Sequence, residues 1–232
     1  MKKKAFTLAE VLITLGIIGT VAALTIPGLI TKHRKAETEA KIKQTYSILS
    51  NAIKMSEVEN GPFVAQNWGG TSAAQTQAGL REFLFPYLKA QECGIGSATT
   101  CFHKSRYKNL IGGFADSWAM PSSNAVTFQL PNGVAIAFLN NGYDTTDSSY
   151  HLNMYMDVNG VKAPNTYGID LFQFYLIRPQ GGFIGRYHAN KGSLTDQKQT
   201  CSKTDKSYAG GMFNGVNCAA RIMMEGWQIN YW

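Results

Sequence analysis

The feature that most constrains this chain is an apolar run near its N-terminus. Residues 6–30 read FTLAEVLITLGIIGTVAALTIPGLI, which is 25 residues with a single charged side chain, Glu10. A helix of that length extends about 37 Å, and the hydrocarbon core of a bilayer is roughly 30 Å thick. Lys2, Lys3 and Lys4 precede the run, and the positive-inside rule keeps such residues in the cytoplasm. The sequence therefore predicts one membrane-spanning helix, with the remainder of the chain outside the cytoplasm.

Glu10 lies inside this predicted span, where an ionised carboxylate costs about 3 kcal/mol on insertion scales. No other residue of the span carries a charge, so none can serve as its counter-ion. Cleavage between Ala5 and Phe6 would create an α-amino group about one helical turn from Glu10. That amine could approach the carboxylate of a staggered neighbouring helix, and the pair would form only on assembly. We therefore expect Glu10 to hold assembled helices in register.

The start of the chain, KKKAFTLAEVLITL at residues 2–15, resembles the class III signal and helix start of type IV pilins and type II secretion pseudopilins. The resemblance implies that residues 1–5 form a leader. A prepilin peptidase would cut between Ala5 and Phe6 and methylate the amine of Phe6, and Glu10 would align neighbouring subunits. The family normally has Gly before the cut, where this chain has Ala5. Pro27 stands where family members have a proline that bends or melts the helix, here near Ala23.

The resemblance also implies a function. It predicts a prepilin-like structural subunit of a type IV pilus or a type II secretion pseudopilus, which forms homo- or hetero-oligomers with other pilin-like subunits. An assembly ATPase and a platform protein are implied as partners. The location would be the bacterial inner membrane, with a single pass, and then a periplasmic or extracellular filament. Two alternatives stay open: a membrane-anchored binding module that never polymerises, and a minor or tip subunit with an adhesive or DNA-uptake role.

Beyond the span, residues 31–60 are expected to continue the helix in amphipathic form. Ile42, Tyr46, Leu49 and Ile53 recur at helical spacing and form one apolar stripe, which should pack on the remaining domain. The charged residues should face water or neighbouring subunits. These residues are Lys32, Arg34, Lys35, Glu37 and Glu39. The turn residues Asn60, Gly61 and Pro62 should end the helix.

Residues 61–232 read as a globular α+β head with an antiparallel sheet packed on the second half of the first helix, a type IV pilin-like fold. A helix is expected near residues 78–90 and a short one in the 218–232 tail. The sequence Leu130-Pro-Asn-Gly-Val134 separates two alternating runs and predicts a hairpin. The predicted strands are 126–130, 134–139, 151–158, 172–178 and 183–187.

The four cysteines fall into two local pairs. No CxxC is present and no histidine stands at zinc-finger spacing, so a metal site built on the cysteines is disfavoured. An even number of cysteines in an exported chain favours disulfides. Four cysteines allow three connectivities, and the simplest is local closure. We therefore predict the disulfides Cys93–Cys101 and Cys201–Cys218. They would staple two loops, and they imply an oxidising compartment.

The segment from 157 to 170 is the one part of the head that suggests ligand chemistry. Asp157, Asn159, Asn165 and Asp170 carry oxygen ligands of the kind that calcium accepts. The spacing is not that of an EF-hand, because Gly160 stands at the fourth position and the final Glu is absent. The alternative interpretation is an Asx-turn followed by a Pro-Asn turn, in which the side chains bind the backbone. Calcium is thus a candidate cofactor and a structural turn is the favoured alternative.

Composition disfavours the remaining function classes. Residues 60–232 hold 13 Lys or Arg against 10 Asp or Glu, and such a head is not expected to bind nucleic acid. No G-x-S-x-G, H-E-x-x-H or Walker motif is present, so no catalytic residues are predicted and the chain is not expected to be an enzyme. Trp68 and Trp118 are candidates for sugar or peptide binding, although such residues more often fill a core.

Overall fold

The computed structural model describes residues 7–68, 72–115, 122–139, 151–177, 182–185, 194–206 and 213–232. The chain divides into two compact units, Met1–Thr38 and Glu39–Trp232. The longest element is α1, Leu8–Asn60, and it spans the boundary between the units. Its last residue precedes Gly61, which has a φ of +77°, and Pro62, so the predicted helix end is confirmed.

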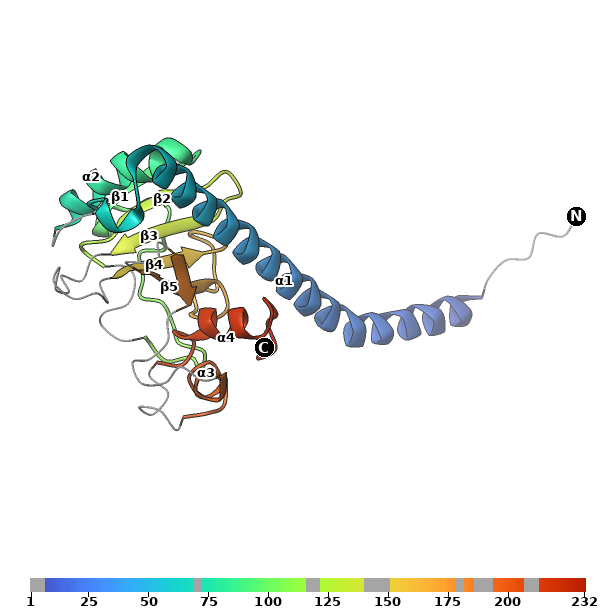
Figure 1. Ribbon diagram of the computed structural model, residues 1–232. Helices are drawn as coiled ribbons and strands as arrows, with labels where there is room; N and C mark the ends of the chain where they lie inside the picture. The colour runs from blue at the N-terminus through green and yellow to red at the C-terminus, as the bar shows by residue number, and fades with distance from the viewer. Residues whose placement is uncertain are drawn as a thin grey trace, which may run out of the picture. The chain divides into compact units, whose positions relative to one another are not determined.

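A single antiparallel sheet forms the centre of the Glu39–Trp232 unit (Figure 1). Its strands follow one another in the order of the chain, from β1 at one edge to β6 at the other. This arrangement confirms the predicted α+β fold with an antiparallel sheet. The strands are β1 (Gln91–Ile95), β2 (Val126–Gln129), β3 (Ala135–Leu139), β4 (His151–Asp157), β5 (Leu171–Ile177) and β6 (Gly182–Gly185).

Strand β1 was not expected from the sequence, because QECGI shows no alternation of apolar and polar residues. It forms through its pairing with β2, and the register shifts between Glu92 and Gly94. The predicted hairpin between β2 and β3 is present. Gly133 has a φ of +81° and its N–H donates to the carbonyl oxygen of Leu130 at 2.9 Å, which is a turn geometry that glycine adopts without strain.

The shorter helices differ in part from the predictions. Helix α2, Ala73–Phe83, begins at a capping box in which Ser72 and Gln75 exchange hydrogen bonds. It ends before the 3-10 turn Phe85–Tyr87, because Pro86 cannot continue an α-helix. A helix is therefore present near the predicted range 78–90, but both predicted bounds are wrong. Helix α3, Leu194–Thr200, was not predicted, whereas α4, Cys218–Met224, is the expected helix of the tail. Two further 3-10 turns are Phe63–Ala65 and Gly96–Ala98.

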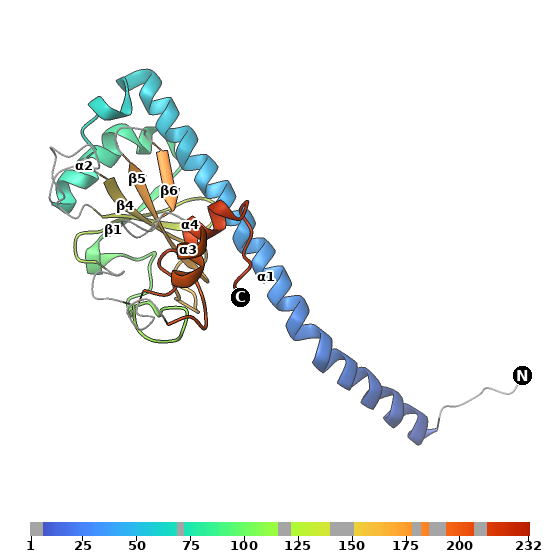
Figure 2. The same cartoon turned by 60° about the horizontal axis from the view of Figure 1, so that its bottom comes forward.

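The second half of α1 packs on the sheet through the predicted stripe. Ile42, Leu49 and Ile53 are fully buried and belong to the same core cluster as the apolar residues of β2 to β6. Tyr46 is half-buried, and its hydroxyl donates to the carbonyl oxygen of Phe183 in β6 at 3.1 Å. Figure 2 shows this stretch of α1 running alongside the sheet. The stripe prediction is confirmed.

The end of the chain is fastened to two separate parts of the unit. Glu39 in α1 is half-buried, and its Oε1 accepts a hydrogen bond from the N–H of Ile229 at 2.7 Å, an intrachain contact that the sequence did not predict. The hydroxyl of Tyr231 and the indole N–H of Trp232 both donate to the carbonyl oxygen of Gly168, at 2.9 and 2.8 Å. A Cβ at Gly168 would lie 2.6 Å from Sγ of Cys218, so this position requires glycine.

Leu49→Ala should lower the free energy of unfolding by about 2–5 kcal/mol, because it removes a fully buried side chain and leaves a cavity between α1 and the sheet. Urea unfolding of the full chain in detergent measures the change. Ser47→Ala, at an exposed position of the same helix, is the control and should change stability by less than about 0.5 kcal/mol. Equal stability of the two variants would contradict this packing.

Candidate functional site

The first half of α1 presents apolar side chains that are exposed among the described residues. Among the described residues, one helix, α1, is long and apolar enough to cross a membrane, and its apolar part lies near the N-terminus. Leu24, for example, is 83% exposed. The large apolar residues exposed between positions 8 and 30 are Leu8, Val11, Leu12, Ile13, Leu15, Ile17, Ile18, Val21, Leu24, Ile26, Leu29 and Ile30.

The hydroxyl groups of this segment are satisfied within the helix. Thr14, Thr20 and Thr25 donate from Oγ1 to the carbonyl oxygens of residues three or four positions earlier, at 2.9 to 3.0 Å. A buried or lipid-facing hydroxyl without a partner would cost free energy. These internal bonds therefore make the segment compatible with surroundings that contain no water.

Glu10 forms a capping box with Thr7 at the start of α1. The backbone N–H and the hydroxyl of Thr7 each donate to Oε2 of Glu10 at 2.8 Å, and the N–H of Glu10 donates to Oγ1 of Thr7 at 3.3 Å. The sequence Thr7-Leu-Ala-Glu10 is the T-x-x-E signal for this motif, and our sequence reasoning missed it. Glu10 thus has neutral partners in its own helix, whereas the structure supplies no counter-ion for it among the described residues.

Small residues and a proline mark the same segment. A Cβ at Gly16 or Gly19 would meet no atom within 4 Å, so both positions leave room for close approach of another helix. Helix α1 runs through Pro27 without a break, so of the two expected outcomes near Ala23, a bend or local melting, melting is wrong and the bend stays a prediction. Ala5 and Phe6, the predicted processing residues, lie outside the described residues, and the cleavage stays a prediction.

The structure brings the four predicted calcium ligands into one loop between β4 and β5. Asp157 and Asp170 are buried. Oδ2 of Asp157 accepts a 2.5 Å hydrogen bond from the Tyr107 hydroxyl, and its Oδ1 accepts one from the N–H of Asn159. Burial and the nearby carboxylate of Asp170 raise the pKa of Asp157 to about 8.

The other carboxylate is also occupied by protein donors. Oδ2 and Oδ1 of Asp170 accept 2.6 Å hydrogen bonds from the backbone N–H groups of Asn165 and Thr166. Asn165 has a φ of +52°, a conformation that Asn tolerates better than most residues. These bonds form the side-chain-to-backbone turns of the alternative interpretation.

Calcium takes roughly six to eight oxygen ligands, and this loop does not offer them. Within the described residues, the buried oxygens without a donor in this loop are the amide oxygens of Asn159 and Asn165. The same part of the chain holds no cluster of three or more His, Cys, Asp or Glu side chains suited to a metal. As arranged, the residues do not fit a calcium site, and the loop is held by its own hydrogen bonds.

Both predicted disulfides are present. Cys93–Cys101 links β1 to the segment after the Gly96–Ala98 turn, and Cys201–Cys218 links the residue after α3 to the first residue of α4. Trp68 is buried and its ring centroid lies 5.0 Å from that of Phe63, so it belongs to the core and not to a binding surface. Trp118 lies outside the described residues.

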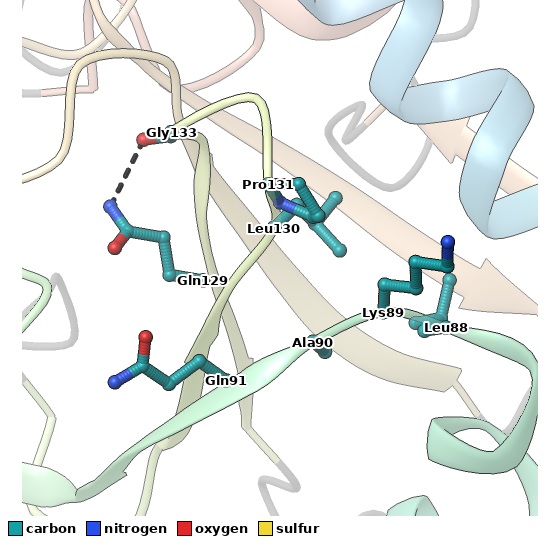
Figure 3. Close-up of a pocket in the computed structure, with 8 residues that line it drawn as sticks. All are labelled: Leu88, Lys89, Ala90, Gln91, Gln129, Leu130, Pro131 and Gly133. Atoms are coloured by element: carbon teal, nitrogen blue, oxygen red, sulfur yellow. Dashed lines mark hydrogen bonds between the residues drawn. The ribbon is translucent and has the colours of Figure 1, made fainter.

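An open groove of about 560 Å³ lies where β1 and the β2–β3 hairpin diverge (Figure 3). Gln91 and Gln129 face each other across the two strands, and Nε2 of Gln129 donates to the carbonyl oxygen of Gly133 at 3.2 Å. Lys89 lies at the other end of the groove, beside Leu88. The lining offers amide groups and one ammonium group, and no carboxylate, thiol or imidazole.

An apolar, membrane-length helix followed by a disulfide-stapled antiparallel head defines a pilin-like α+β protein. The chain belongs to the family described as "Family of unknown function (DUF6613)", which matches residues 28–231. It is also similar to the Type II secretion system core protein G of Escherichia coli (strain K12), with 31% identity over 68 residues. That match covers 29% of this chain and 46% of the relative, so the chain spans about half of that protein's length. No solved structure matches the chain.

Removing calcium with EGTA should leave the melting temperature of the folded chain unchanged, because N–H and O–H groups already occupy the carboxylates. Asp170→Ala should lower it, since two buried N–H groups lose their acceptor at about 1–3 kcal/mol each. Lys162→Ala, an exposed change in the same loop, is the control. A melting temperature that falls with EGTA and recovers with calcium chloride would restore the calcium interpretation.

Proposed function

We propose that this chain is a structural subunit that assembles with other pilin-like subunits through the first half of α1. The observation that carries the proposal is a helix of uncovered apolar side chains interrupted by a single carboxylate, Glu10. The assembled object is a type II secretion pseudopilus or a type IV pilus. Similarity to a core protein of the type II secretion system supports the first of these.

The apolar surface determines where the helix can reside. Burial of each large apolar side chain is worth about 1.5–3 kcal/mol, so the segment cannot remain in water. A bilayer covers it before assembly, and the helices of other subunits cover it afterwards. The subunit therefore passes from the membrane into a filament core without exposing these side chains. The open positions at Gly16 and Gly19 allow helices to approach closely in that core.

Glu10 gives the assembly its register. Thr7 satisfies the carboxylate with neutral donors but leaves its charge uncompensated. Removal of residues 1–5 by a prepilin peptidase creates a methylated amine at Phe6, which is the counter-ion that the span lacks. Pairing of that amine with Glu10 of a neighbouring subunit is favourable in surroundings without water. In this proposal the chain is inserted once in the inner membrane, and an assembly ATPase and a platform protein drive the polymerisation.

Glu10→Gln separates the two roles of this residue. Glutamine still accepts the hydrogen bonds of the capping box, but it cannot pair with a cation. We expect Glu10→Gln to insert in the membrane with normal helicity and to lose most filaments, as measured by shearing and sedimentation from the native host. Glu10→Leu should lose the cap as well. Normal filament yield from Glu10→Gln would refute the register role.

Mass spectrometry of the N-terminus distinguishes this function from that of a membrane-anchored binding module. Protein from the native host should begin with N-methylated Phe6, because processing supplies the amine that Glu10 requires. A variant with Phe6→Asp changes the residue at the predicted cut and serves as the unprocessed reference. Recovery of the intact Met1–Ala5 leader on the assembled protein would contradict the proposal and favour a simple anchor.

A further inference from the structure

The C-terminal end of α1 carries an acidic patch, formed by Met55, Glu57, Val58 and Glu59, in which Glu57 is half-buried and the other three are exposed. Val58 is 87% exposed, and Met55 lies three residues earlier and is also exposed. The last turn of α1 contains no basic residue. Carboxylates at the C-terminal end of a helix are disfavoured by the helix dipole. This turn therefore combines an exposed apolar side chain with two acids placed against local electrostatics, an arrangement that a cationic partner would stabilise.

The acids of this patch make one internal contact each. Oε1 of Glu57 accepts a hydrogen bond from the N–H of Phe63 at 3.0 Å, and Oε2 of Glu59 accepts one from the hydroxyl of Tyr87 at 2.8 Å. Both donors are neutral, so these two bonds do not themselves compensate the charges of the carboxylates. The nearest base in the sequence is Lys54, one turn earlier.

A basic patch, formed by Lys104, Arg106, Lys108 and Phe114, lies on the segment after Cys101. Tyr107 is fully buried and bonds to Asp157, while Arg106 and Lys108 on either side of it are exposed. Lys108 faces Phe114 across an antiparallel bridge, and the Arg106 guanidinium lies 5.7 Å from the centre of the Phe114 ring. Phe114 is 61% exposed. Residues 101–115 contain three Lys or Arg and no Asp or Glu.

The two patches match in chemistry and differ in position. Each consists of an exposed apolar side chain between charges of one sign, and the signs are opposite. In Figures 1 and 2 the end of α1 and the green segment that holds residues 101–115 lie at opposite ends of the Glu39–Trp232 unit. A contact between two different patches on identical chains is a head-to-tail contact, and it generates a filament wherever the rotation from copy to copy does not close a ring.

We propose that the acidic patch of one copy docks on the basic patch of the next copy. This docking rests on the proposed assembly function. Val58 covers the ring of Phe114, and the carboxylates of Glu57 and Glu59 face Arg106 and Lys108. A polyanion such as a nucleic acid would engage the basic patch alone and would be repelled by the acidic one. A second copy of the chain compensates both patches at once, and the helix contact of the assembled subunits brings them together repeatedly.

Cysteine cross-linking in the native host tests the docking directly. Full-length chain with both Val58→Cys and Phe114→Cys should form a ladder of multimers on mild oxidation, whereas each single variant should not. The pair Val58→Cys with Met224→Cys, whose second position is exposed on α4, is the matched control. A ladder from the control pair equal to that of the test pair would overturn the docking.

An independent cysteine in the apolar helix, Ile17→Cys, reports assembly without the head. A cross-linked dimer through Ile17→Cys with no ladder through the 58/114 pair would overturn the docking and leave the proposed function intact. Absence of both the Ile17→Cys dimer and the 58/114 ladder would overturn the proposed function, and the docking with it. The two failures are therefore distinguishable.

A charge exchange provides the second measurement. Lys108→Glu should reduce the 58/114 cross-link about tenfold, because it places like charges across the contact. Adding Glu59→Lys in the same chain should restore the cross-link, and thermal melting of each variant checks that the head is folded. An unchanged cross-link in folded Lys108→Glu would overturn the proposal.

Discussion

The exclusion of water from the first half of α1 is the constraint on which the rest of this molecule depends. A dozen large apolar side chains between Leu8 and Ile30 have no cover within the chain, and every one of them needs lipid or another helix. The internal bonds of Thr14, Thr20 and Thr25 and the capping box of Thr7 and Glu10 remove the polar obstacles to such surroundings. Among the described residues of this segment, only the charge of Glu10 is left without compensation, and in the proposed assembly this makes Glu10 the position that sets the register.

In the assembly that we propose, the Glu39–Trp232 unit solves the opposite problem, since it must remain folded in water and close to other copies of itself. The second half of α1 fills one side of the sheet with Ile42, Leu49 and Ile53. Two local disulfides fasten the segments that follow β1 and α3. With its interior closed in this way, the unit still carries apolar side chains, such as Val58 and Phe114, at its surface.

Periodic features of the sequence were predictable, whereas features created by tertiary contacts were not. The stripe from Ile42 to Ile53, the hairpin at Gly133 and the local cysteine pairs follow from spacing or turn chemistry alone. Strand β1 depends on its pairing with β2, and Gly94 weakens any local signal. The acids at 157 and 170 were recognised, but which donors surround them depends on Tyr107, which is 50 residues away from Asp157 in the chain. The T-x-x-E signal at Thr7 was present and would have identified the cap of Glu10.

Gly168 connects three segments that are distant in the sequence. Its carbonyl oxygen accepts from Tyr231 and Trp232, and its missing side chain makes room for Cys218 of the second disulfide. The turn before β5, the start of α4 and the C-terminal aromatics therefore share one backbone position. It follows that these segments should open and close as a single cooperative unit, with similar protection of their amides, and not fray one after another from the chain end.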